Sequence, residues 1–468
     1  MARIIFYGFI FISGYIASRV LSTEHFGQLH YVTFLINVLW MFTNLGIPNV
    51  ISRYFPQAYQ QQHKSSVRQL LKVSLLAFAG TNVLVGISFY YFFERASIEL
   101  PLLPMLAFAG SQFLLTYLNI FIQSIYRYRA TFWMNMIACI AGTVFLYVTI
   151  SKFGAVAYIY SFILVNLILS VGYIITINKA IAIIPDKTSD FELPNTPQLL
   201  KTALYFAVSA ILAGMVWQRF ELSILKNYFD YAHLAVYGVA FTVIALFAEP
   251  LKLIPGVLLY YFANMGDKHE EASERFEAFF KHFSWLVIFI GTFIWFDAEH
   301  IITLLYTDKY LESAYYVKIL LPGIIPGVCS YALMSTHVGL GKARFLFIQD
   351  IITATLFLGL AFGLIHTFGL EGAAWAKSVA IGCSVTMGLI YTHFRLKYRV
   401  PFQSLFLSVV IALLLVAPFQ GAFSANWLFI ILKFLIGFVL YVLLSWLTRI
   451  IDHSLVIRMI TEFKSKLR

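Results

Sequence analysis

The chain has 468 residues, of which 60% are hydrophobic, 18% aromatic and only 12% charged, and its mean hydropathy is +0.82. Soluble domains carry about 25% charged residues, so this composition excludes a soluble protein. The net charge of +11 could suggest nucleic acid, but in a chain this apolar we expect basic residues to set membrane topology and expect no nucleic-acid partner. The composition therefore indicates an α-helical membrane protein with many spans.

Hydrophobic runs long enough to cross a bilayer recur from one end of the chain to the other, since about 20 apolar residues in a helix span the hydrocarbon core. A β-barrel is excluded because its strands would alternate polar and apolar residues. The first run could be read as a signal peptide, but we count it as a span because removing it would break the alternation of basic loops. We expect about fourteen spans, with edges open by several residues: 4–20, 30–50, 70–93, 102–122, 131–150, 155–177, 200–225, 233–257, 283–303, 314–340, 345–366, 370–394, 402–419 and 426–448.

The distribution of Lys and Arg predicts the orientation of these spans. Most of the 33 basic residues fall in alternate loops, which the positive-inside rule places in the cytoplasm. Both the N-terminus and the C-terminus are therefore expected on the cytoplasmic side. The basic loops are 53–72, 127–129, 179–201, 268–281, 342–344, 395–399 and the tail 449–468.

Two local signatures recur at nearly the same offset and predict an internal repeat. Gly27 in EHFGQLHYV matches Gly238 in AVYGVAFTV, and Gly154 in KFGAVAYIYS matches Gly369 in TFGLEGAAWAK. A unit of six spans returns the chain to the same side of the membrane, so the halves must be parallel. We expect an N-terminal half at 1–178, a cytoplasmic linker at 179–199, a C-terminal half at 200–395, and two additional spans with a cytoplasmic tail at 396–468.

Span four carries a polar stripe on an otherwise apolar helix. Its polar residues recur every three or four positions, which places them on one helical face. An amide-lined face of this kind suits substrate hydroxyls, and a basic residue at its end suits a phosphate; hydrogen bonds between helices are the alternative. The stripe consists of Gln112, Thr116, Asn119, Gln123 and Arg127.

Span seven contains AGMVWQRFELSILKNYF, residues 213–229, and so carries Arg219 and Glu221 within a membrane segment. Arg19 in span one lies at a similar expected depth, and Lys377 lies about two turns into span twelve. A buried arginine costs at least about 2.5 kcal/mol at a helix centre, so it should face a watery cavity or a partner. We expect these residues to form a cationic cavity for an anionic substrate; snorkelling to the interface is the alternative for each.

Acidic residues in or near spans are candidates for coupling to H⁺ or Na⁺. Glu221 lies in span seven, and Glu249 lies near the inner end of span eight, where it is followed by Pro250. Glu249 has an alternative role as a capping or interfacial residue. The chain offers no nucleotide-binding glycine loop, no metal-ligand cluster and no nucleophile with a matched base, so we expect no catalytic residues, no metal and no cofactor.

The chain resembles Wzx-type polysaccharide flippases, which belong to the multidrug/oligosaccharidyl-lipid/polysaccharide (MOP) exporter superfamily. The resemblance covers nearly the whole chain and is most specific in the RVLS…FG…LG…R pattern of Arg19, Gly27, Gly46 and Arg53, and in FGLEGAAWA from Phe368. Leu21-Ser22 departs from the usual Leu-Gly at this turn. Arg19 and Arg53 match positions where relatives carry basic residues.

This resemblance implies a flippase, not an enzyme, in the bacterial cytoplasmic membrane. It would move an undecaprenyl-diphosphate-linked oligosaccharide to the outer leaflet by alternating access, coupled to an ion gradient, for surface polysaccharides such as O-antigen. Its partners would be that lipid, H⁺ or Na⁺, membrane lipids and other polysaccharide-assembly proteins. The alternatives are a lipid II flippase, a MATE-like small-molecule antiporter, and a membrane glycosyltransferase or polymerase, which the short outer loops disfavour.

Overall fold

The computed structural model describes residues 2–44, 46–96, 98–125, 127–184, 196–256, 258, 262, 269–419 and 426–451. All regular structure in these ranges is helical. Nine of the described helices are long and apolar enough to cross a membrane, and three shorter apolar helices accompany them, at Ile5–Val20, Ala207–Trp217 and Phe402–Val416. The predicted class, an all-α protein with many membrane spans, is confirmed.

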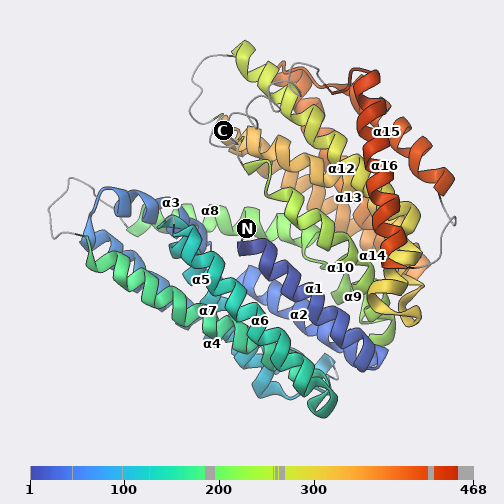
Figure 1. Cartoon of the computed structure of the whole chain (residues 1–468). Helices are drawn as coiled ribbons and strands as arrows, with labels where there is room; N and C mark the ends of the chain where they lie inside the picture. Colours follow the sequence, from blue (N-terminus) through green and yellow to red (C-terminus); the bar gives the residue numbers. More distant parts are fainter. Residues whose placement is uncertain are drawn as a thin grey trace, which may run out of the picture. The chain divides into compact units, whose positions relative to one another are not determined.

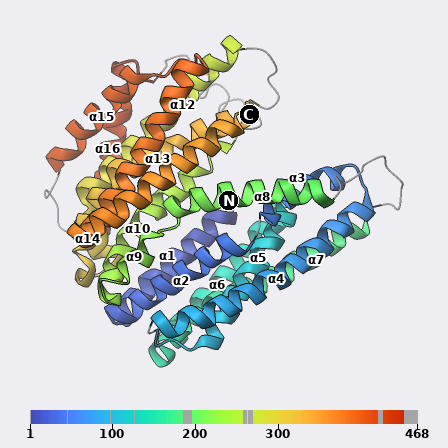
Figure 2. The same ribbon diagram turned by 180° about the vertical axis from the view of Figure 1, so that it is seen from behind.

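Contacts divide the chain into two units, and the first runs from Met1 to Gly238. Within it α6 packs against α1 and α7, α5 packs against α7, and α8 packs against α2 and α3 (Figures 1 and 2). Its helices are α1 (Ala2–Val20), α2 (Thr23–Thr43), α3 (Ile47–Gln60), α4 (Lys64–Ala96), α5 (Leu102–Ser124), α6 (Tyr128–Phe153), α7 (Ala155–Ala182), α8 (Thr196–Trp217), α9 (Glu221–Leu225) and the first part of α10 (Tyr231–Lys252).

The second unit runs from Val239 to Arg468. In it α12 packs against α13, α15 and α16, while α13 packs against α14. Besides the rest of α10, it contains α12 (His269–Tyr306), the short helix η1 (Asp308–Tyr310), α13 (Ser313–Gly339), α14 (Ala343–Ile390), η2 (Tyr391–Arg395), α15 (Phe402–Val416), η3 (Ala417–Phe419) and α16 (Trp427–Leu447). The contacts place α8 in the first unit, whereas the predicted repeat places residues 200–395, and so most of α8, in the second half. The boundaries based on the repeat stay a prediction.

Two expected spans end earlier than the apolar runs suggest. The run 30–50 is divided, because α2 ends at Thr43 and Gly46, at a positive φ of 70°, precedes the separate helix α3. The run 200–225 is also divided, since α8 ends at Trp217. In both places the sequence is continuously apolar, so hydropathy alone does not reveal the turn at which the helix ends.

Gly154 and Gly369 share a backbone conformation that supports the repeat. Gly154 separates α6 from α7 with φ 55° and ψ −135°, and Gly369 interrupts α14 with φ 60° and ψ −131°. Residues with a Cβ rarely adopt this region, so glycine is required at both breaks. The expected spans at 345–366 and 370–394 therefore lie on either side of the break in α14.

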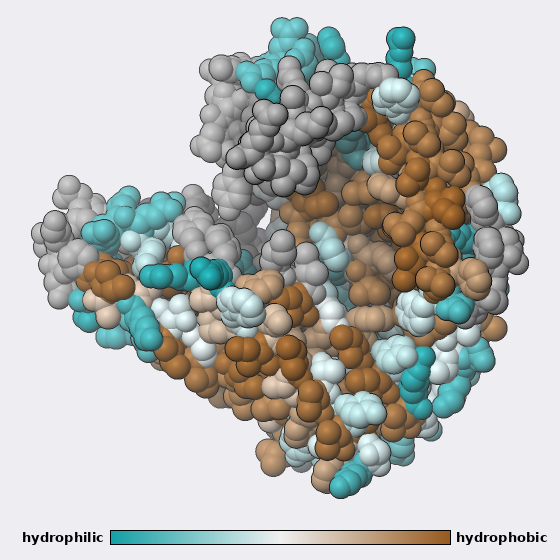
Figure 3. Space-filling model, in the orientation of Figure 1, coloured by the Kyte–Doolittle hydropathy of each residue, from teal (hydrophilic) through white to brown (hydrophobic). Residues whose placement is uncertain are grey.

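Large apolar side chains remain exposed along the helices of both units. Leu76 of α4 is 73% exposed, Tyr147 of α6 is 73% exposed and Phe406 of α15 is 69% exposed. Figure 3 shows hydrophobic residues over much of the visible face of each unit. Apolar exposure on this scale is typical of surfaces that face lipid, since soluble monomers keep such patches small.

We predict that Gly154→Ala and Gly369→Ala each lower the free energy of unfolding by about 1–3 kcal/mol, because alanine is strained at these φ and ψ values. The measurement is thermal unfolding of the purified protein in detergent. Gly359→Ala is the matched control, since Gly359 also lies in α14 and a Cβ there meets open space. Equal unfolding temperatures for Gly369→Ala and the control would contradict the strained breaks.

Candidate functional site

Arg219 lies in a turn and not within a continuous membrane helix. Residues 218–220 form the turn between α8 and the short helix α9. Arg219 has a φ of 60°, in the left-handed region that commonly ends a helix. Its side chain is half-buried. The expected position of Arg219 inside a span at 200–225 is thus corrected, because the chain leaves the helical conformation just before it.

Glu221 is fully buried at the first position of α9. The hydroxyl of Tyr237, on α10, donates a hydrogen bond of 2.8 Å to its Oε1 atom. The positive charge of Arg219 interacts electrostatically with Tyr237, with His30 of α2 and with Tyr158 of α7. We call Arg219, Glu221, His30, Tyr158 and Tyr237 the α9 cluster. It gathers ionisable side chains from five segments of the first unit at one buried place.

A close crossing of α2 and α10 lies beside the α9 cluster. A Cβ atom on Gly27 would overlap the backbone carbonyl of Tyr231, and a Cβ on Gly238 would lie 2.8 Å from Cγ of His30. Small residues allow such an approach of two helix backbones in a membrane. The two glycines that the repeat pairs therefore have a shared structural role, since both lie in this crossing.

Lys377 is fully buried in the second unit, on α14. Its Nζ atom lies 4.6 Å from the ring centroid of Phe241, on α10. A desolvated cation over an aromatic face is stabilised by about 2 kcal/mol. The burial of this lysine disfavours the snorkelling alternative.

The polar stripe of α5 is divided between packing and exposure. The Asn166 amide of α7 donates a hydrogen bond to Gln112 Oε1 at 3.1 Å, and the Thr116 hydroxyl bonds to the Gln112 carbonyl. Further along, Gln123 donates a hydrogen bond to Asn119 Oδ1 at 3.1 Å. The first part of the stripe thus joins α5 to α7, as the packing alternative expects, while Gln123 is exposed.

Arg127 does not continue the stripe of α5. Helix α5 ends at Ser124, and Arg127 is the N-cap residue of α6, with φ −83° and ψ 51°. The prediction of a single face from Gln112 to Arg127 is therefore wrong at its last member, because the helical spacing stops at Ser124. The Arg127 side chain is exposed.

Three further residues that the sequence predicts at a functional site lie outside the α9 cluster. Arg19, in the last turn of α1, is exposed and stacks its guanidinium 3.6 Å from the Tyr15 ring centroid. Glu249 forms an ion pair of 2.6 Å with Lys252, whose Nζ atom lies 5.2 Å from the Tyr331 ring centroid. The side chain of Arg53 lies outside the described part of the structure, although its backbone belongs to α3.

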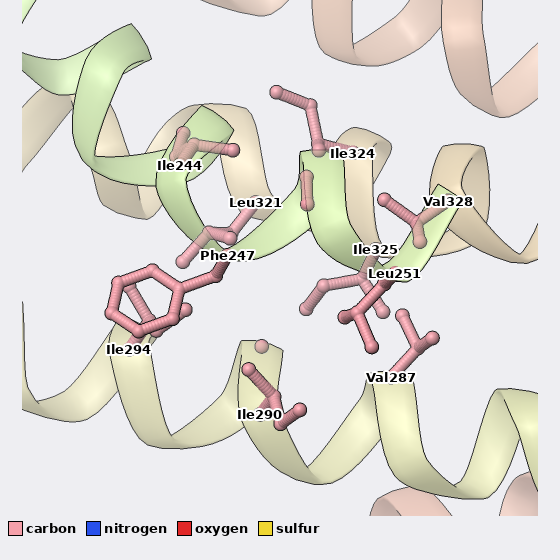
Figure 4. A pocket seen from close by; sticks show the side chains of 12 residues that line it. Ile244, Phe247, Leu251, Val287, Ile290, Ile294, Leu321, Ile324, Ile325 and Val328 are labelled. Atoms are coloured by element: carbon pink, nitrogen blue, oxygen red, sulfur yellow. The ribbon is translucent and has the colours of Figure 1, made fainter. Parts of the chain in front are cut away.

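A small apolar cavity opens in the second unit between α10, α12 and α13 (Figure 4). It measures about 20 Å³, which is room for little more than one water molecule. Its lining is wholly apolar, with Ile244 and Leu251 on α10, Ile290 and Ile294 on α12, and Ile325 on α13 among its residues. This cavity offers neither the polarity nor the room for a sugar or a phosphate.

Among the described residues, no group of three His, Cys, Asp or Glu could hold a metal ion.

Sequence reasoning missed two buried charges in the second unit. Lys433 of α16 and Asp297 of α12 form an ion pair of 2.7 Å, with side chains that are 7% and 2% exposed. The available signal was a lysine as the sole charged residue in the 21-residue helix α16. His30 and Tyr237 were also missed, since nothing local in the sequence places them beside Glu221.

Residues 16–315 match the model of a family described as polysaccharide biosynthesis proteins. The chain belongs to this family. No curated protein sequence matches it.

Solved structures show the fold of this polysaccharide biosynthesis protein. It resembles the lipid II flippase MurJ in an inward closed conformation, with a TM-score of 0.67 and 13% identity over 95% of this chain and 97% of that one. It also resembles an inward-facing multidrug resistance MATE transporter of the MOP superfamily, with a TM-score of 0.63 and 15% identity over 83% of this chain and 94% of that one. A third similar structure is a MOP superfamily transporter from Pyrococcus furiosus, with a TM-score of 0.59 and 13% identity over 85% of this chain and 93% of that one. The family match supports the predicted resemblance to polysaccharide exporters, and the structures confirm the predicted MOP-like fold.

We predict that Tyr237→Phe lowers the free energy of unfolding by about 1–3 kcal/mol, because it removes a hydrogen-bond donor from the buried carboxylate of Glu221. Thermal unfolding in detergent measures the effect. The double variant Tyr237→Phe/Glu221→Gln should lose less than the sum of the two single losses, since the two side chains interact. Tyr147→Phe is the control, because that tyrosine is 73% exposed. Additive losses would contradict a coupled pair.

Proposed function

We propose that the protein is a flippase that moves an undecaprenyl-diphosphate-linked oligosaccharide from the cytoplasmic to the outer leaflet. The observation that carries the proposal is a polysaccharide biosynthesis family match on a chain with a MOP transporter fold. Sugars and phosphates desolvate at high cost, so a lipid-linked oligosaccharide does not cross hydrocarbon unaided. A multi-pass membrane member of such a family fits that step, and surface polysaccharides such as O-antigen would be its product.

The substrate contacts follow from the chemistry of a diphosphate and sugars. Arginine binds phosphate oxygens through paired N–H donors, and lysine binds them as a compact charge. We assign Arg219, a half-buried cation of the first unit, to the diphosphate, and we keep Lys377, fully buried in the second unit, as an independent candidate for binding an anionic group. Arg19 and Arg53 are the corresponding candidates near the ends of α1 and α3, and Arg127 is a candidate at the start of α6.

The amides of α5 are assigned to sugar hydroxyls. Asn119 and Gln123 hydrogen-bond to each other, and each can exchange that bond for a hydroxyl group, because an amide offers both donors and an acceptor. Gln112 and Thr116 support this face from within the packing of α5.

Coupling to an ion gradient is assigned to Glu221 and Glu249. Glu221 is fully buried and accepts a hydrogen bond from the Tyr237 hydroxyl, so binding H⁺ or Na⁺ would change the charge inside the α9 cluster. At Glu249 a bound cation would compete with the Lys252 ammonium, which lies 2.6 Å from the carboxylate. Alternating access would then follow from the differential affinity of the two conformations for the ion.

The proposed location is the bacterial cytoplasmic membrane with both termini in the cytoplasm, from the basic loops. Lipid II transport is the second candidate, favoured by the 95% coverage in the comparison with MurJ. A small-molecule antiporter is less favoured, because the MATE structure matches only 83% of this chain. Partner proteins of polysaccharide assembly would receive the flipped lipid.

We predict that Arg219→Ala reduces surface polysaccharide more than tenfold while leaving the amount of protein in the membrane unchanged, because the diphosphate loses its partner. Immunoblots of surface polysaccharide and of the membrane fraction, in cells that lack the native copy, measure both quantities. Arg449→Ala is the matched control: Arg449 also has a positive φ, of 58°, but lies after α16 and is exposed. Normal export by Arg219→Ala would leave Arg219 with a structural role only.

A further inference from the structure

The ion pair between Asp297 and Lys433 joins α12 to the C-terminal helix α16. Lys433 Nζ donates to Asp297 Oδ1 at 2.7 Å. Around it, the contact between α12 and α16 is aromatic and hydrogen-bonded: Phe289 stacks on Tyr441 with ring centroids 4.8 Å apart, and the Trp285 indole donates to Ser445 Oγ. A buried ion pair adds little net stability beyond what apolar side chains of similar volume supply. We therefore expect this ion pair to have a role other than stabilising the contact between α12 and α16.

His300 brings a third ionisable group to the same carboxylate oxygen. Its Nδ1 atom lies 3.4 Å from Asp297 Oδ1, one helical turn along α12. The histidine side chain is 29% exposed, whereas those of Asp297 and Lys433 are nearly fully buried. Among the described residues, the buried Oδ2 atom of Asp297 accepts no hydrogen bond. The carboxylate thus has remaining acceptor capacity beside a histidine that reaches the surface.

The elements that pack on α12 carry further titratable residues. Glu299 of α12 and Lys318 of α13 form an ion pair of 2.7 Å. Helix α15 has no charged residue, and Lys433 is the single charge of α16. In η1, Asp308 and Lys309 are exposed, Tyr306 and Tyr310 are buried, and Glu312 and Tyr315 lie at the start of α13. With His300 neutral, these charges sum to −1, because four carboxylates stand against three ammonium groups.

We propose that Asp297, His300 and Lys433 form a proton-binding site that controls how firmly α16 is held on α12. A proton from water adds to the free nitrogen of the His300 imidazole, and the resulting imidazolium donates a charge-assisted hydrogen bond from Nδ1 to Asp297 Oδ1. Lys433 then shares that oxygen with a second cation on the same helix as the carboxylate. Because like charges repel strongly where water is scarce, the ammonium of α16 loses part of its attraction to α12.

The bound cation is a proton and not a metal ion. The Lys433 ammonium already occupies Asp297 Oδ1, so a sodium ion at this carboxylate would meet a like charge at short range. Histidine, in contrast, is the side chain that ordinarily changes charge between about pH 5 and 8. The site needs no assumption about the substrate and shares no residue with the α9 cluster.

The test measures access to the α12–α16 contact by cysteine labelling of the full chain in lipid nanodiscs, in a background without Cys139, Cys329 and Cys383. Gly437→Cys places a thiol in the contact, since a Cβ there lies 3.6 Å from the Phe289 ring. Ile436→Cys is the matched control on the same helix, because Ile436 is 52% exposed. The ratio of the two labelling rates with N-ethylmaleimide removes the intrinsic dependence of thiol reactivity on pH.

We predict that this ratio rises at least threefold from pH 8 to pH 5.5 and that His300→Gln abolishes the rise. Lys433→Met should remove the dependence on pH as well, because no ammonium remains to be displaced. A ratio that does not change with pH, or a rise that persists in His300→Gln, would overturn the proposal.

Discussion

Hydrocarbon solvates neither charges nor unpaired polar groups, and three buried charged side chains of the described helices are matched by a partner on another helix. Glu221 accepts a hydrogen bond from Tyr237, Lys377 lies over Phe241, and Lys433 pairs with Asp297. Each of these contacts joins two different helices. The buried polar groups therefore determine which helices are neighbours as well as where chemistry can occur.

Backbone conformation adds a second set of constraints, among them those at four glycines and at Arg219. Gly154 and Gly369 break the helical conformation with nearly the same φ and ψ, and Gly27 and Gly238 allow the close approach of α2 and α10. Arg219 adopts a left-handed conformation between α8 and α9. That turn directs the chain so that Glu221 begins a new helix and lies buried against Tyr237.

Much of the fold is predictable from hydropathy, because the length of an apolar run and the thickness of a bilayer are directly related. The glycine signatures predict a repeat, and the structure gives a reason for glycine at each place: a positive φ at Gly154 and Gly369, and close neighbours at Gly27 and Gly238. The break before Arg219 was not predictable, since α8 and α9 form one apolar run in sequence. The Asp297–Lys433 pair was missed because its members are 136 residues apart, and one sequence gives no indication of such a contact. The stripe on α5 was correct over its helical part and failed at Arg127, where the helix had already ended.

The most direct test of the account is transport of a fluorescent undecaprenyl-diphosphate-linked oligosaccharide in liposomes that contain the purified protein. A membrane-impermeant quencher reports the fraction of lipid in the outer leaflet over time, and lipid II in the same assay separates the two substrate candidates. The account predicts protein-dependent transfer of the oligosaccharide lipid that is lost in Arg219→Ala and no longer responds to an ion gradient in Glu221→Gln. Transfer no faster than in protein-free liposomes, in the presence of a proton or sodium gradient, would contradict it.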